Sequence, residues 1–213
     1  MPVPRRAEET FTTTEAAVIL TMADAQANIT RRAVEGVIVK EFFPSSAVKR
    51  RHRQLALTAT GLLIMAAEFA LRRDLPVAAL RKRIYRTMLR QRAAYGHIAA
   101  GETVTVNVEA PLARASDALS RYRRLMELVE VNPEIQHGEP VLRGTRVTVY
   151  TIAALSAAGT PTEEILRHYP NLTVRQVEAA RLYASAHPRR SHPSSTGIGR
   201  VVLEMGVAEL NAL

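Results

Sequence analysis

The residues in this sequence that are best suited to chemistry are polar and basic side chains that could bind nucleic acid. One group lies close together along the chain and consists of Gln26, Thr30, Arg31 and Arg32. Glutamine can pair with adenine, and arginine with guanine, in the major groove of DNA. We therefore predict that this group reads bases.

A second group is a dense run of cations, Lys49, Arg50, Arg51 and Arg53. Cations of this kind contact phosphates, so they position a protein on DNA and make its affinity depend on salt, but they carry little sequence information. The two groups together predict a DNA-binding surface in the N-terminal part of the chain.

The distribution of charge along the chain favours the same interpretation. Residues 1–100 contain 17 Lys and Arg against 8 Asp and Glu, whereas residues 101–213 contain 12 of each. The whole net charge of +9 therefore comes from the N-terminal half. Such asymmetry indicates a polyanionic partner, with nucleic acid as the leading candidate and solubility alone as the alternative.

Patterns for catalysis or metal binding are missing from the sequence. It contains no phosphate-binding glycine loop or nucleophile elbow, and its six histidines lack metal-ligand spacing. The chain has no cysteine, which excludes disulfides and thiolate metal sites. We expect no enzymatic activity, no metal and no other cofactor. Without a signal-peptide pattern or an apolar run of roughly 20 residues, we expect a cytoplasmic protein with no membrane partner.

The elements that would position the DNA-binding groups begin with a capping box, Thr12 to Glu15, which starts a helix running to about Leu20. A short turn follows, and Asp24 is expected to cap a second helix that ends near Gly36. This layout would place the first polar group on a recognition helix. The alternative is a two-helix core hairpin with a solvated polar face.

Residues 37–43 and 53–56 predict two strands, linked by residues 44–46 and the basic run. Such a hairpin would form the wing of a winged helix-turn-helix. The arrangement over residues 8–73 resembles the winged domains of MerR-like regulators.

Residues 74–130 are expected to connect this region to the C-terminal part. A helix is predicted from about residue 75 to 95, and its arginines could either approach DNA or form a solvated face. A strand over residues 102–109 needs a partner, either from a second subunit or from the same chain. An amphipathic helix is predicted from Pro111 to about Glu130.

The stretch from Glu139 to Tyr150 predicts a hairpin, because apolar residues flank the turn signal Arg143-Gly144. Two helices are expected to follow. The first begins at a capping box over residues 160–163, with proline at its first position, and the second at the box over residues 173–176. The pair predicts a helix-turn-helix-like module, and packing or dimerisation is the alternative role.

A known family shares these features. The sequence GEPVLRGTRV at residues 138–147, with Ala158-Gly159, EEIL at 163–166, Tyr169-Pro170 and Leu172-Thr173, resembles domain of unknown function family 433. One departure is His137, which stands where the motif has the first of two glycines. Longer members that resemble this chain are antitoxins of toxins with PIN-like nuclease folds.

The resemblance implies a type II antitoxin that neutralises a PIN-like ribonuclease toxin and represses its own operon at operator DNA. It also implies a homodimer and a toxin–antitoxin hetero-oligomer. The alternative is a stand-alone winged helix-turn-helix regulator without a toxin partner, whose C-terminal module dimerises or senses a ligand.

Residues 187–213 are predicted to bind the toxin. A linker rich in proline, serine and glycine delivers an apolar segment beyond the globular part of the chain. By the resemblance, Arg200 would pair with the acidic active site of the toxin, and apolar neighbours would anchor it. The predicted contacts are Ile198, Arg200, Val201, Val202, Leu203, Met205 and Leu210. The alternative is a frayed terminus or one docked on its own domain.

The sequence thus predicts a mainly α fold with short β-hairpins, in which an N-terminal winged helix-turn-helix precedes a C-terminal helix-turn-helix-like trihelical domain. The expected divisions are 8–73, 74–130, 131–186 and 187–213.

Overall fold

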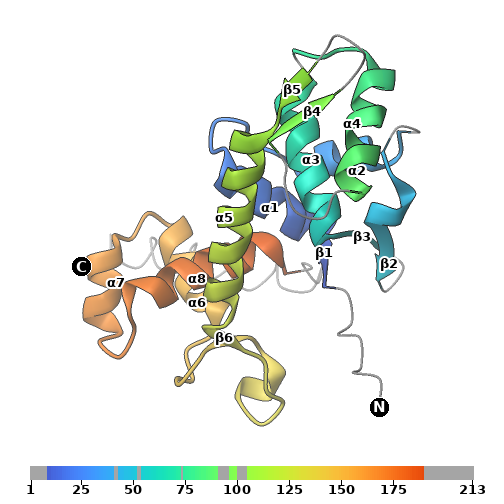
Figure 1. Cartoon of the computed structure of the whole chain (residues 1–213). Helices are drawn as coiled ribbons and strands as arrows, with labels where there is room; N and C mark the ends of the chain where they lie inside the picture. Colours follow the sequence, from blue (N-terminus) through green and yellow to red (C-terminus); the bar gives the residue numbers. More distant parts are fainter. Residues whose placement is uncertain are drawn as a thin grey trace, which may run out of the picture.

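The computed structural model of the chain describes residues 9–40, 43–51, 54–72, 74–90, 96–99 and 105–189. Within these residues the protein is mainly helical, with short antiparallel strand pairs (Figure 1). The predicted class, a mainly α fold with short β-hairpins, is therefore confirmed. None of the described helices is both long and apolar enough to span a bilayer.

The N-terminal part combines three helices with a small antiparallel sheet whose strand order is β1-β3-β2. Its elements are β1 (Thr10–Thr12), α1 (Thr13–Ala23), α2 (Arg31–Ile38), the 3-10 helix η1 (Ser45–Ala47), β2 (Val48–Arg51), β3 (Gln54–Thr58) and α3 (Ala59–Leu71). The predicted capping box of α1 is present, because Thr12 Oγ1 accepts from the Glu15 amide and Glu15 Oε2 accepts from the Thr12 amide.

The second helix begins later than predicted. Asp24 does not cap a helix; its side chain accepts from the amide of Gln26 and closes a local turn. The N-cap of α2 is Thr30, whose hydroxyl accepts from the Ala33 amide at 3.2 Å. The residues between Ala23 and Thr30 form a loop, and Gly36 lies inside α2 rather than after it.

The strand predicted over residues 37–43 is wrong for the part that the structure describes, residues 37–40 and 43. Residues 37 and 38 complete α2, since Val34 and Val37 recur at helical spacing and are buried. The first strand of the hairpin is instead the basic run itself, in β2, which pairs antiparallel with β3.

The middle of the chain comprises α4 (Ala78–Arg90), β4 (His97–Ala99), β5 (Thr105–Asn107) and α5 (Glu109–Met126). Helix α4 starts three residues after the predicted position. Strand β5 pairs antiparallel with β4 of the same chain. Of the two predicted sources of a partner strand, a second subunit or the same chain, the structure therefore has the same chain. Helix α5 ends before the predicted Glu130, because Val129 and Glu130 form a strand.

The C-terminal part comprises β6 (Val129–Glu130), the 3-10 helix η2 (Gln136–Gly138), β7 (Val141–Leu142), α6 (Val149–Ala157), α7 (Thr162–His168) and α8 (Val174–Ala186). Strand β7 pairs with β6 and is bridged from Val141 to Thr148 across the predicted turn. The capping box predicted for α7 is wrong, since Pro161 occupies the N-cap and contributes no side-chain hydrogen bond. The box of α8, formed by Thr173 and Gln176, is confirmed.

Two clusters of buried apolar residues form the core. The first includes residues from Phe11 to Tyr122, and the second is built mainly from residues between Leu125 and Ala180. Helix α5 contributes to both, and it runs lengthwise between the N-terminal elements and helices α6 to α8 (Figure 1). The predicted domain bounds stay a prediction, but the first cluster extends well beyond residue 73.

Glu15 links these two parts of the chain. Its Oε1 accepts a hydrogen bond from the Tyr122 hydroxyl at 3.1 Å and lies 3.6 Å from Nε2 of His187, at the end of α8. Burial raises the pKa of Tyr122, and the Glu15 carboxylate raises it further. The N-terminal helix, α5 and the end of α8 therefore meet at one carboxylate.

Candidate nucleic-acid interface

The loop between α1 and α2 carries Gln26 on an exposed segment rather than on a helix. Two hydrogen bonds hold the end of this loop on α1: Thr21 Oγ1 accepts from the amide of Ile29 at 3.1 Å and donates to its carbonyl at 3.2 Å. Asn28 adopts the left-handed region with a φ of 39°, which an asparagine tolerates. Gln26 is therefore displayed to solvent by a loop that is fixed at its C-terminal end.

Helix α2 exposes its predicted cations at its N-terminal end. Arg31 and Arg32 occupy the first turn and are both exposed, whereas Val34 and Val37 face the core. Cations at a helix N-terminus oppose the helix dipole, and α2 has no acidic residue in its first turn. This arrangement does not favour helix stability, but it joins two guanidinium groups to the amide end of a helix, which suits an anionic partner.

Arg31 is already engaged within its own helix. Its Nε donates to Glu35 Oε1 at 2.7 Å. The hydrogen bond from Arg31 lowers the pKa of the Glu35 carboxyl, so this carboxylate stays ionised to lower pH than an isolated glutamate would. Because the Arg31 side chain is 60% exposed and that of Glu35 36% exposed, solvent screens the pair and it adds little to stability.

Strand β2 carries the second predicted group. It is an edge strand, and its residues Lys49 and Arg50 lie opposite Ala56 and Leu55 of β3. Successive residues of a strand point to opposite faces, and both of these cations are exposed. Arg51 also belongs to β2, and Arg53 lies outside the described residues. The described cations of this group therefore lie along a strand of the hairpin, whereas the sequence placed them in the link between two strands.

The cations of α4 divide into two kinds. Arg81 is buried, and its Nε donates to Glu68 Oε2 at 2.9 Å, so it is a core residue. Arg83, Arg86 and Arg90 are exposed on the same helix. From the sequence, all of these arginines were predicted either to approach DNA or to form a solvated face, and neither prediction applies to the buried Arg81.

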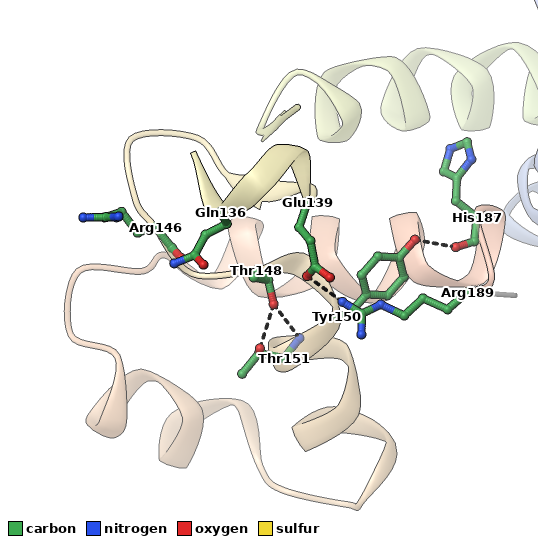
Figure 2. A network of polar contacts seen from close by, with 8 residues as sticks. All are labelled: Gln136, Glu139, Arg146, Thr148, Tyr150, Thr151, His187 and Arg189. Atoms are coloured by element: carbon green, nitrogen blue, oxygen red, sulfur yellow. Dashed lines mark hydrogen bonds and ion pairs between the residues drawn. The ribbon is translucent and has the colours of Figure 1, made fainter. Parts of the chain in front are cut away.

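A separate network of polar contacts surrounds the start of α6 (Figure 2). Arg189 donates to Glu139 Oε2 at 2.5 Å, and its guanidinium lies 4.4 Å from the centroid of the Tyr150 ring. The Tyr150 hydroxyl donates to the carbonyl of His187 at 2.8 Å. Burial raises the pKa of Tyr150, and the positive charge of Arg189 opposes that shift. The chain segment that follows α8 is thus attached to the stretch from Glu139 to Tyr150.

The turn within that stretch is also held from α8. Gly144 has a φ of 78°, and Gln176 Nε2 donates to the carbonyl of Arg143 at 3.1 Å. Just before it, Gln136 and His137 adopt positive φ values of 49° and 56°. His137, the residue that departs from the glycine of the motif, therefore occupies a conformation that glycine adopts more readily.

The predicted toxin-binding residues, from Ile198 to Leu210, lie outside the described residues. The described part of the chain also contains no group of three or more His, Asp or Glu side chains that could hold a metal ion.

Comparison with known proteins supports the resemblance for one part of the chain. Residues 129–184 match the family described as "Protein of unknown function (DUF433)". This segment contains the turn at Gly144, the α6 and α7 helices and most of α8, and thus most of the network of Figure 2.

One relative is the "Uncharacterized protein y4eO" of Sinorhizobium fredii (strain NBRC 101917 / NGR234), with 38% identity over 89 residues. The aligned segment covers 42% of this chain and 40% of the relative, so less than half of either protein is compared. No solved structure matches the chain significantly.

Proposed function

We propose that this protein is an antitoxin that binds operator DNA through its N-terminal part and neutralises a PIN-like ribonuclease toxin through the segment after Arg189. The observation that carries the DNA-binding role is the exposure of Arg31 and Arg32 on α2, followed by a hairpin that exposes Lys49 and Arg50. Helix, helix and hairpin in this order are the elements of a winged helix-turn-helix.

The excess of positive charge supports the same assignment. It belongs to residues 1–100, where the helices and the hairpin lie, and the C-terminal half is neutral. Phosphate contacts by exposed arginine and lysine supply most of the affinity of a protein for DNA. In this role, α2 enters the major groove and the β2–β3 hairpin contacts the backbone beside it.

The toxin-binding role rests on the family resemblance and on how the chain leaves α8. Tyr150 bonds to His187, and Glu139 bonds to Arg189. The chain is therefore attached to the region that matches family 433 immediately before the proposed toxin-binding segment begins. The segment that follows carries the apolar run from Ile198 to Met205, with Arg200 inside it. A toxin whose active site is acidic would accept that arginine.

Substituting exposed cations tests the DNA-binding role. We expect Arg32→Gln combined with Arg50→Gln to weaken binding to the DNA upstream of its own gene. The slope of log affinity against log salt should fall by about one for each phosphate contact removed. Arg175→Gln is the matched control, because Arg175 is also an exposed arginine in the first turn of a helix, α8. Unchanged affinity and slope in the double variant would exclude the proposed interface.

Deleting residues 190–213 tests the toxin-binding role. The shortened chain keeps the contacts of His187 and Arg189, so it should bind DNA but fail to rescue growth of cells that express the toxin. The toxin is expected to be encoded by an adjacent gene and to copurify with the full chain. Arg200→Glu should impair rescue, whereas Arg190→Glu, in the linker, should not. Full rescue by the shortened chain would exclude the segment after Arg189 as the toxin-binding part, and no rescue by the full chain would favour a stand-alone regulator.

A further inference from the structure

A cavity lies where the N-terminal and C-terminal parts of the chain meet. It has a volume of about 460 Å³ and is lined by α1, the end of the α1–α2 loop, the start of α2 and α8. This volume falls within the roughly 300–1,000 Å³ of ligand sites in proteins. The cavity therefore has room for a small organic molecule. It borders both the proposed DNA-binding helix α2 and the C-terminal helix α8.

The interior of the cavity is apolar. Val18 and Met22 of α1, Ile29 of the loop and Leu182 of α8 supply its walls. Its hydroxyls are largely satisfied by the protein: Thr21 exchanges two hydrogen bonds with Ile29, and Ser185 donates to the carbonyl of Arg181. Such a surface offers water few partners and favours a hydrocarbon or aromatic body. Methionine adapts its shape to such ligands.

Among the residues that the structure describes, Arg31 is the one charged residue that lines the cavity. It bonds to Glu35 through Nε, and its side chain is 60% exposed, so the terminal amino groups of the guanidinium can take a second acidic group. An arginine fork binds a carboxylate or sulfonate with good geometry. The cavity thus combines an apolar interior with one cation at its edge.

We propose that this cavity binds a small amphipathic anion, with its apolar body between α1 and α8 and its acidic group on Arg31. Ligand binding occupies an arginine that DNA would otherwise use, so the ligand lowers the affinity for DNA. The effect of the ligand on DNA affinity rests on the proposed DNA-binding function, whereas ligand binding itself does not.

The binding test uses the full chain and the fluorescent anion 8-anilinonaphthalene-1-sulfonate. We expect saturable binding that decanoate and 1-naphthoate displace and decyltrimethylammonium does not. Preference between decanoate and 1-naphthoate distinguishes a straight-chain ligand from an aromatic one. Displacement by the cationic detergent as effective as that by decanoate would overturn the proposal.

Variants locate the binding. Val18→Phe should fill the cavity and reduce probe affinity at least about tenfold, and Arg31→Gln should reduce it about tenfold by removing a charge-assisted contact. Arg32→Gln is the matched control and should keep the affinity for the probe, because Arg32 does not line the cavity. Arg31 is exposed, so its substitution remains informative if Val18→Phe fails to fold. Equal probe affinity in the unmodified chain and in Arg31→Gln would overturn the site.

A final measurement separates the site from its effect on DNA. Decanoate should weaken DNA binding by the unmodified chain and leave that of Val18→Phe unchanged. If the chain binds no DNA but binds the probe as described, the proposed function fails and the ligand site stands. If decanoate displaces the probe without altering DNA binding, the inference that ligand and DNA compete for Arg31 is wrong.

Discussion

Glu68 shows how a single buried charge changes the role of its neighbours. Its side chain is 1% exposed, and its Oε2 accepts hydrogen bonds from Arg81 and from the Tyr85 hydroxyl. Burial raises the pKa of Tyr85 far above its ordinary value, and the bond to Glu68 adds to the shift. A buried carboxylate persists only when it is paired, so Arg81 serves the core. The cations of α4 that a polyanion can reach are the exposed ones, Arg83, Arg86 and Arg90.

Two glycines lie inside helices of the N-terminal part, and substitution by alanine is expected to change stability in opposite directions at the two positions. A Cβ on Gly61 of α3 would lie 2.3 Å from the carbonyl oxygen of Ala47, whereas one on Gly36 of α2 would meet nothing within 4 Å. Alanine is favoured over glycine in a helix by about 1 kcal/mol. We expect Gly36→Ala to raise the free energy of unfolding by about 0.5–1 kcal/mol. Gly61→Ala should lower it by about 1–3 kcal/mol, because backbone must shift to relieve the overlap.

Urea denaturation followed by circular dichroism measures both variants. Gly36→Ala is the matched control, since it makes the same chemical change inside another helix of the N-terminal part. A Gly61→Ala variant as stable as the unmodified chain would mean that η1 and α3 do not pack as closely as described.

At the scale of elements, the sequence predicts best where the structure is determined locally. The capping boxes of α1 and α8 are formed by side chains three residues apart, and both are confirmed. The start of α2 could not be predicted in this way, because Asp24 and Thr30 are both residues that cap helices. The choice between them depends on Ile29, which is buried and bonded to Thr21 of α1.

The candidate site, too, was predictable only where residue type or a local pattern determines it. The charges of Arg31, Arg32, Lys49 and Arg50 follow from residue type, and all four are exposed. The placement of the last two on a strand depends on pairing with β3, which no local pattern encodes. The network around Tyr150 joins residues 37 and 50 positions apart, so neither the predicted hairpin nor the resemblance to family 433 indicated its contacts.

At the scale of the whole molecule, the first core cluster does not end with the predicted N-terminal domain. Helix α4 supplies Ile84, Tyr85 and Met88 to it, and α5 supplies residues from Leu112 to Tyr122. Without these helices, the apolar sides of α1 and α3 would face water. The proposed DNA-binding elements therefore depend on α5, which also belongs to the second cluster.

We accordingly predict that a fragment of residues 1–74 does not fold, although it contains every proposed DNA-binding residue. Loss of α4 and α5 removes several fully buried side chains, each contributing about 1.5–3 kcal/mol, which is comparable to the total stability of about 5–15 kcal/mol of a domain. A fragment of residues 1–128 keeps the first cluster apart from Ala186 of α8 and should unfold cooperatively in urea, at lower concentrations than the full chain because α8 no longer covers α1 and α5. Cooperative unfolding of the short fragment near the midpoint of the full chain would contradict this dependence. The expected outcome would mean that α1 and α3 need α4 and α5 to cover their apolar sides, so that the proposed DNA-binding cations of α2 depend on helices outside the predicted N-terminal domain.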